Sequence, residues 1–291
     1  MAEKQRVAVV TGASSGIGKE MAKALIGQGW RVIGTGRDAG RMAAAEAEIA
    51  AAAAPGGTVE MLSADLSLMT EAENLARAVA QRTDRLDLLV NNAGRMTDRL
   101  EMTSEGLEAN FAGNHLGPFV LTDRLLPLLR AAAQDAPAGS VRVLMTASDA
   151  SEMTPTINLD DMQNLDHFNP GLAYCTSKLA NVLFARALAG RLADDGIVAH
   201  AMAPGATDTP FFDNAPAETR AHTQNLAKLS VAEGADTLIW LVDAKEAGES
   251  SGGYWEKRAP RPPHPVVNDP AVVERFWRES QKLAAAGLAR G

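Results

Sequence analysis

Residues 6–18 read RVAVVTGASSGIG, a short apolar strand that runs into a glycine-rich turn and then into a helical pattern. In this turn Gly12, Gly16 and Gly18 would let the backbone bend tightly and come close to a pyrophosphate. The helix that follows would offer free N–H groups and the positive end of its dipole to the anion. The spacing is G-x-x-x-G-x-G rather than G-x-G-x-x-G, so an ordinary glycine-rich turn remains the alternative.

Apolar runs of strand length alternate with amphipathic segments of helix length along the rest of the chain. The predicted strands are RVAVVTG (6–12), WRVIGTG (30–36), VEMLSAD (59–65), RLDLLVNNAG (85–94), VRVLMTAS (141–148), IVAHAMAPG (197–205) and SGGYW (251–255). The predicted helices lie within residues 19–28, 41–53, 68–82, 104–133 and 174–195. This alternation predicts a single α/β domain over residues 1–291, a doubly wound (Rossmann) parallel sheet with helices on both faces.

The composition excludes several classes of function. The 291 residues include 28 Lys and Arg against 36 Asp and Glu, a formal net charge of −8, which argues against nucleic acid as a partner. The only cysteine, Cys175, excludes an internal disulfide, as a reducing cytoplasm would permit. No metal site is predicted, because the histidines are scattered without ligand spacing; they are His115, His167, His200, His222 and His264.

The sequence also lacks the marks of a membrane protein. No apolar segment precedes the first strand, and no run of about 18 apolar residues could span a bilayer. A soluble, cytoplasmic protein with no membrane partner is therefore expected. The alanine-rich stretch AAAEAEIAAAAAP at 43–55 is expected to form a surface helix.

Two segments fit the alternation poorly, residues 149–170 and the tail from about 254 to 291. Long irregular segments in a compact domain are usually functional loops or disordered ones, and in a doubly wound sheet such loops gather beyond the carboxyl ends of the strands. We expect both segments, together with a loop at about 205–230, to border a substrate. Pro118 and Pro127 interrupt the fourth predicted helix, so we expect a kink or a late start there.

Further strand ends carry polar residues suited to a nucleotide. Asp65, at the end of the third predicted strand, could accept a hydrogen bond from an adenine amino group, and NNAG at 91–94 follows the fourth strand. Either feature alone could be an ordinary turn. Together with the glycine-rich turn they favour a dinucleotide site.

The end of the second predicted strand bears on the choice of cofactor. An enzyme selective for NAD commonly places a carboxylate there, which would repel a 2′-phosphate. This strand instead ends in Gly36, followed by Arg37, whose guanidinium could grip a phosphate through two hydrogen bonds. NADP(H) is therefore predicted over NAD, although Asp38 could weaken the hold of the arginine, and a solvated surface arginine is the alternative.

The stretch GLAYCTSKLANVLF at 171–184 places Tyr174 and Lys178 four residues apart in an apolar run. On a helix the two side chains share a face, and an ammonium beside a phenol favours its anion and lowers the phenol pKa toward the range of efficient proton transfer. The alternative is a core tyrosine with a lysine that reaches solvent. Ser148, at the end of a predicted strand, and Asn114, in the helix after NNAG, favour the catalytic interpretation.

With these motifs in order, the chain resembles the short-chain dehydrogenase/reductase family, and within it the retinol dehydrogenase-like branch. The family pattern comprises TGASSGIG at 11–18, Asp65, NNAG at 91–94, Asn114, Ser148, YCTSK at 174–178 and PGATDT at 204–209. The narrower resemblance rests on GNHLGPFVLTDRLLPLL at 113–129, on residues 171–184 and on the C-terminal GGYWEKRAP and ERFWRES. It covers about residue 5 to about residue 285.

The resemblance implies a role for each catalytic residue. Tyr174 would donate a proton to the carbonyl oxygen in reduction and accept it in oxidation, and Lys178 would lower the pKa of Tyr174 and hold the nicotinamide ribose. Ser148 would polarise the substrate carbonyl, and Asn114 would support a water that relays protons to Lys178. The implied cofactor contacts are Gly12, Ser14, Ser15, Gly16, Ile17, Gly18, Arg37, Asp65, Leu66, Asn92, Ala93, Gly94, Tyr174, Lys178, Pro204, Gly205, Thr207 and Thr209.

The chain departs from the family pattern in two respects. Ala147 and Ser151 stand where retinol dehydrogenase-like members often have a serine and a histidine, so retinoid specificity does not carry over. Membrane-bound relatives bear an N-terminal anchor that is not found here, which again predicts a soluble protein.

These observations predict an NADP(H)-dependent enzyme that interconverts a small-molecule ketone or aldehyde and its alcohol. A bulky, lipophilic substrate is expected from the 149–170 segment and from the aromatic residues of the tail, Tyr254, Trp255, Phe276 and Trp277. A nucleotide-sensing protein without turnover is the alternative, and a scaffold that uses the proline-rich APRPPHP is a third interpretation. A homo-oligomer is compatible with the sequence but not specified by it.

Overall fold

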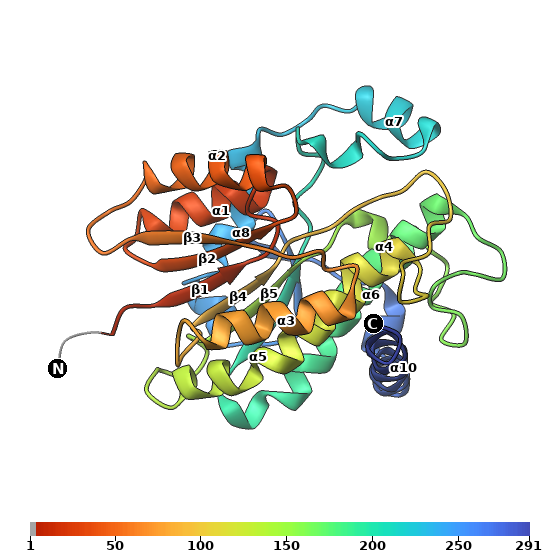
Figure 1. Ribbon diagram of the computed structural model, residues 1–291. Coiled ribbons are helices and arrows are strands. Elements are labelled where there is room, and N and C mark those ends of the chain that lie inside the picture. Colours follow the sequence, from red (N-terminus) through yellow and green to blue (C-terminus); the bar gives the residue numbers. More distant parts are fainter. Residues whose placement is uncertain (1–3) are drawn as a thin grey trace.

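One sheet of eight strands runs through the protein, as a computed structural model describing residues 4–291 shows (Figure 1). In sheet order the strands are β3 (Thr58–Ser63), β2 (Arg31–Gly36), β1 (Val7–Val10), β4 (Leu88–Asn91), β5 (Arg142–Thr146), β6 (Val198–Met202), β7 (Gly253–Glu256) and β8 (Ala259–Pro260). All neighbouring strands are parallel except β7 and β8, which form an antiparallel hairpin at one edge. The predicted doubly wound parallel sheet in a single domain is confirmed.

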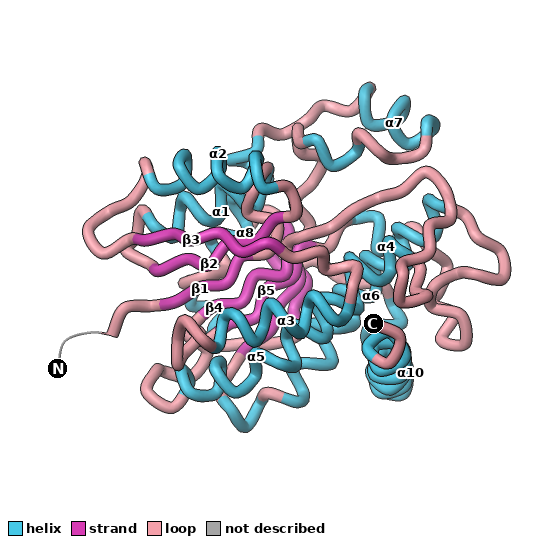
Figure 2. Tube along the Cα trace, in the orientation of Figure 1, coloured by secondary structure: helices cyan, strands magenta, loops and turns pink. Residues whose placement is uncertain are grey.

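The helices form a layer on each face of the sheet (Figure 2). They are α1 (Gly16–Ile26), α2 (Ala39–Ala50), α3 (Met69–Ala80), α4 (Ala109–Phe111), α5 (Gly117–Ala133), α6 (Pro170–Arg191), α7 (Ala217–Gln224), α8 (Val231–Trp240), α9 (Lys245–Gly248) and α10 (Pro270–Leu288). One apolar core joins the sheet to α1, α2 and α8, and the other joins it to α3, α5, α6 and α10. Both faces are therefore buried, which explains why the central strands are apolar throughout.

The strand order reverses at β1, which lies between β2 and β4. The chain moves outward in one direction from β1 to β3 and then returns to begin the second half at β4. In a doubly wound sheet this reversal leaves a crevice beyond the carboxyl ends of the strands, where ligands bind. The topology therefore places the glycine-rich turn after β1 beside the NNAG segment after β4.

Close packing explains the glycine that ends this turn. A β-carbon on Gly18 would lie 2.4 Å from the Gly12 carbonyl oxygen and 2.5 Å from Asn92 Nδ2. Gly18 is buried inside α1, which can approach the turn only because this side chain is absent. Gly12 and Gly16 have φ values of 69° and 53°, a region that side chains rarely adopt, so they shape the turn itself.

The fourth predicted helix is divided, as its prolines suggested. A π-helical turn, Ala112–Leu116, separates the short α4 from α5. Pro118 lies in the first turn of α5, where it needs no N–H partner, while Pro127 lies inside that helix. Such π turns are often found at functional sites, and this one carries Asn114.

The aromatic residues of the tail contribute to the core. Phe276 is fully buried on α10 next to His115, and Trp277 packs against Phe119 and Phe184. Trp255 on β7 is also buried. The expectation that these rings face a substrate is therefore wrong, because α10 must cover the apolar surface of α5 and α6.

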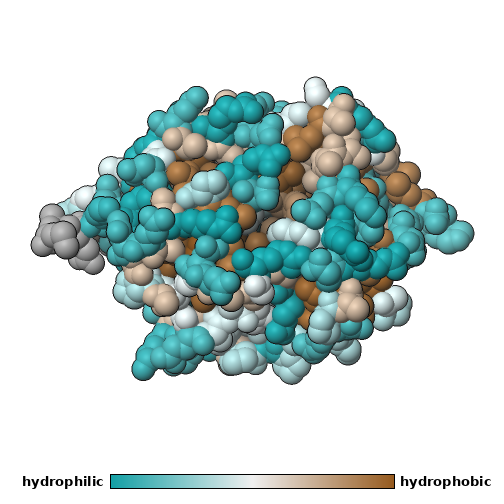
Figure 3. Space-filling view, turned by 90° about the horizontal axis from the view of Figure 1, so that it is seen from below, coloured by the Kyte–Doolittle hydropathy of each residue, from teal (hydrophilic) through white to brown (hydrophobic). Residues whose placement is uncertain are grey.

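The surface seen from below the view of Figure 1 is mostly hydrophilic, with small apolar areas between polar side chains (Figure 3). Among residues 4–291 no helix is long and apolar enough to cross a bilayer. The alanine-rich surface helix is α2, which ends at Ala50 instead of continuing to residue 55. A turn closed by a hydrogen bond from the Gly57 N–H to the Ala54 carbonyl oxygen leads into β3.

We predict that Gly18→Ala destabilises the protein by about 1–3 kcal/mol, the usual cost of overpacking, because the new methyl group meets a fixed backbone carbonyl. Gly190→Ala is the matched control, since Gly190 lies in α6 with no atom within 4 Å of the added methyl group. The control should be neutral or raise stability by up to about 1 kcal/mol. Urea unfolding without cofactor measures both, and equal stability of the two variants would contradict this explanation of Gly18.

Candidate active site

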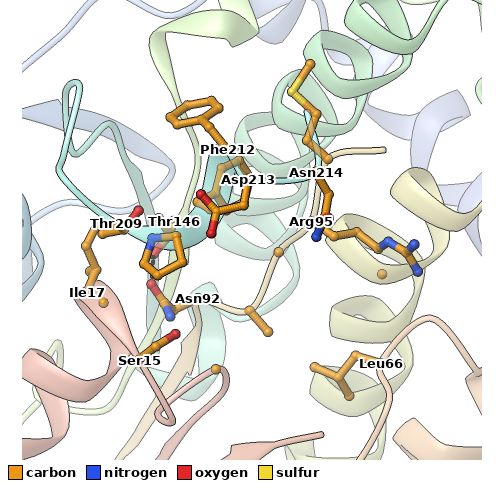
Figure 4. A pocket seen from close by; sticks show the side chains of 18 of the residues that line it. Ser15, Ile17, Leu66, Asn92, Arg95, Thr146, Thr209, Phe212, Asp213 and Asn214 are labelled. Atoms are coloured by element: carbon orange, nitrogen blue, oxygen red, sulfur yellow. Dashed lines mark hydrogen bonds between the residues drawn. The ribbon is translucent and has the colours of Figure 1, made fainter. Parts of the chain in front are cut away.

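A cavity of about 690 Å³ lies beyond the carboxyl ends of the central strands. Its walls come from the turn after β1, from the ends of β2 to β6, from α6 and from the segment before and within α7. Figure 4 shows Ser15, Ile17 and Asn92 on one side of it and Leu66 and Arg95 across from them. The cavity therefore occupies the crevice that the reversal of strand order creates.

Most of the residues implied by the family resemblance meet at this cavity. Those lining it are Gly12, Ser14, Ser15, Gly16, Ile17, Arg37, Asp65, Leu66, Asn92, Ala93, Gly94, Ser148, Tyr174, Lys178, Pro204, Gly205, Thr207 and Thr209. Gly18 and Asn114 are not part of the lining. Gly18 serves helix packing rather than contact within the cavity. Asn114 lies behind the wall beside Gly94, and its expected support of a proton-relaying water stays a prediction.

The glycine-rich turn can accept an anion. Ser15 precedes α1 with an extended backbone, and its side chain does not cap the helix, so N–H groups of the first turn remain available. The backbone also comes close to the next strand end, since a β-carbon on Gly12 would lie 3.0 Å from Ala93 Cα. These features fit a pyrophosphate at the start of α1.

Asn92 braces this side of the cavity. Its Nδ2 donates to the Thr11 carbonyl oxygen at 3.0 Å, and its Oδ1 accepts from the Thr146 hydroxyl at 3.1 Å. The backbone N–H groups of Asn92 and Ala93 both donate to the Thr11 hydroxyl. Asn92 therefore ties together the ends of β1, β4 and β5.

The end of β2 offers positive charge to the cavity. Arg37 and Arg41 both line it, and Arg37 Nη1 lies 3.7 Å from Asp65 Oδ2. Asp38 points elsewhere: it is the N-cap of α2, and its Oδ1 accepts from the Arg41 backbone N–H at 2.7 Å. Arg41 could not be selected from the sequence, because only the structure shows that the first turn of α2 borders the cavity.

Asp65 is held in its ionised form. Burial opposes ionisation, but hydrogen bonds from the Ser67 N–H and hydroxyl, with the positive charge of Arg37, hold the pKa of Asp65 below its usual range. The carboxylate oxygens accept and cannot donate, as an adenine amino group requires. Gly36 lies close by, where a β-carbon would come within 3.0 Å of Ser14.

Tyr174 and Lys178 lie on α6 and are both buried. Lys178 Nζ donates to the Thr146 carbonyl oxygen at 3.0 Å and lies 5.8 Å from the centre of the Tyr174 ring. Burial lowers the pKa of Lys178 to about 8. Burial also raises the pKa of Tyr174 well above its usual range, and the nearby Ser148 hydroxyl only partly opposes this. Burial therefore dominates the pKa of Tyr174 in this state, and a lowering of that pKa by Lys178 stays a prediction.

Ser148 follows β5 by two residues and lines the same cavity as Tyr174. Its hydroxyl donates to Asp149 Oδ1 at 2.9 Å, because a carboxylate can only accept, and its Oγ accepts from the Ala150 N–H at 3.2 Å. The negative charge of Asp149 adds to the effect of burial in raising the pKa of Tyr174. Asp149 therefore competes with a substrate carbonyl for the serine proton.

Asn114 supports the floor of the cavity. Its Oδ1 accepts from the Arg95 N–H at 2.7 Å, and its Nδ2 donates to the Arg95 carbonyl oxygen and the Ser177 hydroxyl, both at 2.9 Å. Gly94 separates it from the catalytic lysine: a β-carbon there would lie 3.3 Å from Asn114 Oδ1 and 3.4 Å from Lys178 Nζ. The side chain of Asn114 thus holds the segment after NNAG close to Lys178.

Comparison with known proteins agrees with this arrangement. The family model described as short chain dehydrogenase matches residues 6–220, nearly three quarters of the chain. The chain belongs to this family. Relatives within it include retinol dehydrogenase 13 of Homo sapiens, 30% identical over 96% of this chain and 84% of the relative. Polyprenol dehydrogenase of Mus musculus is 33% identical over 97% of this chain and 84% of the relative.

Among solved structures, the chain is similar to the Pseudomonas aeruginosa RhlG/NADP active-site complex, with a TM-score of 0.67 and 29% identity. The similarity covers 86% of this chain and 93% of that one. This short chain dehydrogenase is accordingly an NAD(P)-dependent oxidoreductase that acts on CH–OH and C=O groups of small molecules. The open start of α1 and the close approach at Gly12 fit its nicotinamide cofactor.

The substrate side of the cavity has an apolar wall that sequence reasoning did not identify. Phe211 and Phe212 line it, and the Phe211 ring lies 5.7 Å from the Tyr174 ring. Met96 and Ala215 belong to the same apolar cluster. Their spacing along the chain has no regular period, so only the fold brings these residues together.

The flanking segments were only partly assigned correctly. Of the described residues, the lining includes many from 205–230 but none from 149–170 or 254–291. Residues of 205–230 therefore line the cavity, and their contact with a substrate stays a prediction. The other two segments do not border the cavity, because they pack against each other and against α6 on its outer side.

We predict that Asp149→Asn shifts the rising limb of the pH profile for alcohol oxidation to lower pH. The role expected of Tyr174 requires its deprotonated form in oxidation, and loss of the neighbouring negative charge lowers the pKa of this phenol. Initial rates of NAD(P)H formation between pH 6 and 11 measure the shift. Asp166→Asn is the control, because Asp166 is exposed and is not among the charges that raise the pKa of Tyr174. A profile unchanged by Asp149→Asn would show that the Asp149 charge does not act on the tyrosine.

Proposed function

We propose that this enzyme is an NADP(H)-dependent oxidoreductase that interconverts a bulky, lipophilic ketone or aldehyde and its alcohol. The observation that carries the proposal is the convergence of Ser148, Tyr174 and Lys178 on a cavity whose opposite wall is the anion-binding turn after β1. A nucleotide sensor would not require this triad beside an open apolar wall. A cytoplasmic location is proposed on the composition alone.

In the proposed reduction, Ser148 turns its hydroxyl from Asp149 to the substrate carbonyl oxygen and orients it. Tyr174 donates its proton to the same oxygen, which favours a buried, neutral phenol as the starting state. Lys178 stays charged below a pH of about 8, and its ammonium favours the phenolate that forms. The bound nicotinamide supplies the hydride, or accepts it in the reverse direction. The polypeptide supplies placement and a proton.

The preference for NADP(H) is supported by the end of β2. Arg37 and Arg41 border the cavity there, while Asp38 does not line it: its carboxylate accepts from the Arg41 N–H at the start of α2 and lies 3.9 Å from Arg41 Nε. Guanidinium groups bind phosphate through paired hydrogen bonds. The NADP complex of the similar P. aeruginosa structure agrees with this assignment.

A lipophilic substrate is supported by the wall formed by Met96, Phe211 and Phe212 beside Tyr174. Such a wall binds apolar surface, with an expected gain of roughly 25 cal/mol per Å² buried. The names of the relatives, retinol dehydrogenase and polyprenol dehydrogenase, point to long apolar alcohols. These names support the lipophilic class of substrate, and the apolar wall beside Tyr174 comes from Met96, Phe211 and Phe212 rather than from the C-terminal tail.

We predict that Tyr174→Phe lowers turnover by about 10²–10⁴-fold and leaves NADPH binding nearly unchanged, because the ring still packs while its transferable proton is lost. NADPH oxidation with a panel of lipophilic carbonyls gives the rate, and quenching of protein fluorescence gives the NADPH affinity. More than about a tenth of the wild-type rate in this variant would exclude Tyr174 as the proton donor. Tight NADPH binding by wild type without turnover of any substrate would favour the sensor.

We predict that Arg37→Ala weakens NADPH binding by about 1.5–3 kcal/mol, the range for hydrogen bonds to charged groups, and changes NADH binding little. Arg130→Ala is the control, because Arg130 is similarly exposed but pairs with Asp195 away from the cavity. Titration of each variant with both cofactors decides the matter. Equal losses for NADPH and NADH would mean that Arg37 does not contact the 2′-phosphate, and Arg41→Ala then tests the second guanidinium.

A further inference from the structure

Tyr254 lies directly behind the candidate catalytic serine. It is the second residue of β7, is 2% exposed and does not line the cavity. Its hydroxyl donates to the backbone carbonyl oxygen of Ser148 at 2.9 Å. Two residues 106 positions apart in the chain are thus joined by a buried hydrogen bond.

The Ser148 carbonyl is the centre of a small network. The same oxygen accepts from the Ser151 N–H at 3.0 Å, which closes the 3-10 turn Asp149–Glu152. The Ser151 hydroxyl in turn lies 3.4 Å from the Tyr254 hydroxyl, so the phenol both donates to the turn and accepts from it. The donor and acceptor capacity of the phenol is therefore used within this one turn.

A charged clamp holds the other end of the turn. Arg261, just after β8, makes two contacts with the Glu152 carboxylate, Nε–Oε1 at 2.7 Å and Nη2–Oε2 at 3.0 Å. Its backbone N–H donates to the Tyr254 carbonyl oxygen at 2.7 Å, and its Nη1 reaches Glu256 at 2.8 Å. The β7–β8 hairpin therefore fixes the turn at both ends, at Ser148 and at Glu152.

This geometry bears on the orientation of the serine hydroxyl. Ser148 has an extended backbone, with φ −168° and ψ 156°, and its carbonyl oxygen lies four covalent bonds from Oγ. Holding this oxygen restricts rotation about Cα–C and therefore fixes the direction of the Cα–Cβ bond that carries the hydroxyl. Tyr254 cannot act on substrate itself, because its hydroxyl is engaged in the turn and its ring is buried outside the cavity.

We propose that Tyr254 is a positioning residue for the carbonyl chemistry, acting through the Ser148 backbone to hold the serine hydroxyl toward Tyr174. The proposal rests on the role of Ser148 in the proposed function. It assigns to the edge hairpin a part in activity that is separate from substrate contact. Loss of the phenolic hydroxyl should lower kcat while leaving the KM for NADPH unchanged.

A double-mutant cycle on the full-length enzyme tests this. Tyr254→Phe keeps the ring and removes the bond, and should lower kcat about two- to tenfold, the range corresponding to one hydrogen bond. In a Ser148→Ala background the same substitution should have no further effect on kcat, because the hydroxyl that it positions is gone. Equal losses in the two backgrounds, or no loss in the wild-type background, would overturn the proposal.

Trp255→Phe is the matched control. Trp255 neighbours Tyr254 on the same strand, and its Nε1 donates to His200 Nδ1 at 3.0 Å on the opposite side of the sheet. This variant also loses one buried hydrogen bond from β7, so it reproduces a purely structural effect. Its kcat should stay at the wild-type value, and a loss equal to that of Tyr254→Phe would assign the effect to the strand as a whole.

Hydrogen exchange gives a readout independent of catalysis. Exchange in a peptide covering 148–153, measured by mass spectrometry, should accelerate in Tyr254→Phe and not in Trp255→Phe, because the phenol anchors to β7 the carbonyl on which the Ser151 N–H closes the turn. Unchanged exchange would overturn the positioning role. If Ser148→Ala kept full turnover, the serine role in the proposed function would fail, while faster exchange would still support the structural link between Tyr254 and the turn.

Discussion

A line of hydrogen bonds from the first strand to the catalytic helix holds the two halves of this fold in register. The hydroxyl and carbonyl oxygens of Thr11 accept from the backbone N–H and Nδ2 of Asn92, and Asn92 Oδ1 accepts from the Thr146 hydroxyl. The Thr146 carbonyl oxygen then accepts from Lys178 Nζ at 3.0 Å. The line crosses the point where the strand order reverses, so it ties the turn that can bind phosphate to the helix that carries Tyr174 and Lys178. The spacing between cofactor and acid is thus set by strand pairing, which is rigid on the scale of catalysis.

Burial gives this site its electrostatic character. It pushes Tyr174 and Lys178 toward their neutral forms, the phenol by raising its pKa and the ammonium by lowering its pKa to about 8. In a region of low dielectric, opposite charges attract each other more strongly than in water. Once Tyr174 gives its proton to the substrate, the attraction between the phenolate and the Lys178 ammonium is therefore large. The negative charge of Asp149 raises the pKa of Tyr174 and so disfavours the phenolate. The same carboxylate that accepts from the Ser148 hydroxyl therefore disfavours alcohol oxidation, which needs the phenolate.

The sequence was most informative where chemistry and backbone geometry coincide. TGASSGIG and NNAG each directly follow a predicted strand, so the strand pattern together with the glycines and asparagines predicted the crevice. Ser148, Tyr174 and Lys178 meet at the cavity as expected. Asp38 could not be assigned, since an N-cap and a ribose ligand look alike until the helix start is known. The prediction for the C-terminal tail was wrong for a related reason. Aromatic residues such as Phe276 and Trp277 show that the tail will bury apolar surface, but not whether it does so against a substrate or against the core. Phe211 and Phe212 had no period that could reveal them.

The edge hairpin connects these observations. β7 and β8 extend the sheet beyond β6, and this extension brings Tyr254 and Arg261 behind the turn that carries Ser148. Without a following element, the end of β5 would be a loop held only by its own 3-10 turn, and a side chain on a loop is placed less accurately than one on a supported strand. The hairpin and α10 together cover the outer side of α6, so the C-terminal part of the chain stabilises the same helix and turn that carry the proton-transfer groups. Substitutions in the tail should therefore influence catalysis through the geometry of Ser148 and Tyr174 rather than through the shape of the substrate cavity.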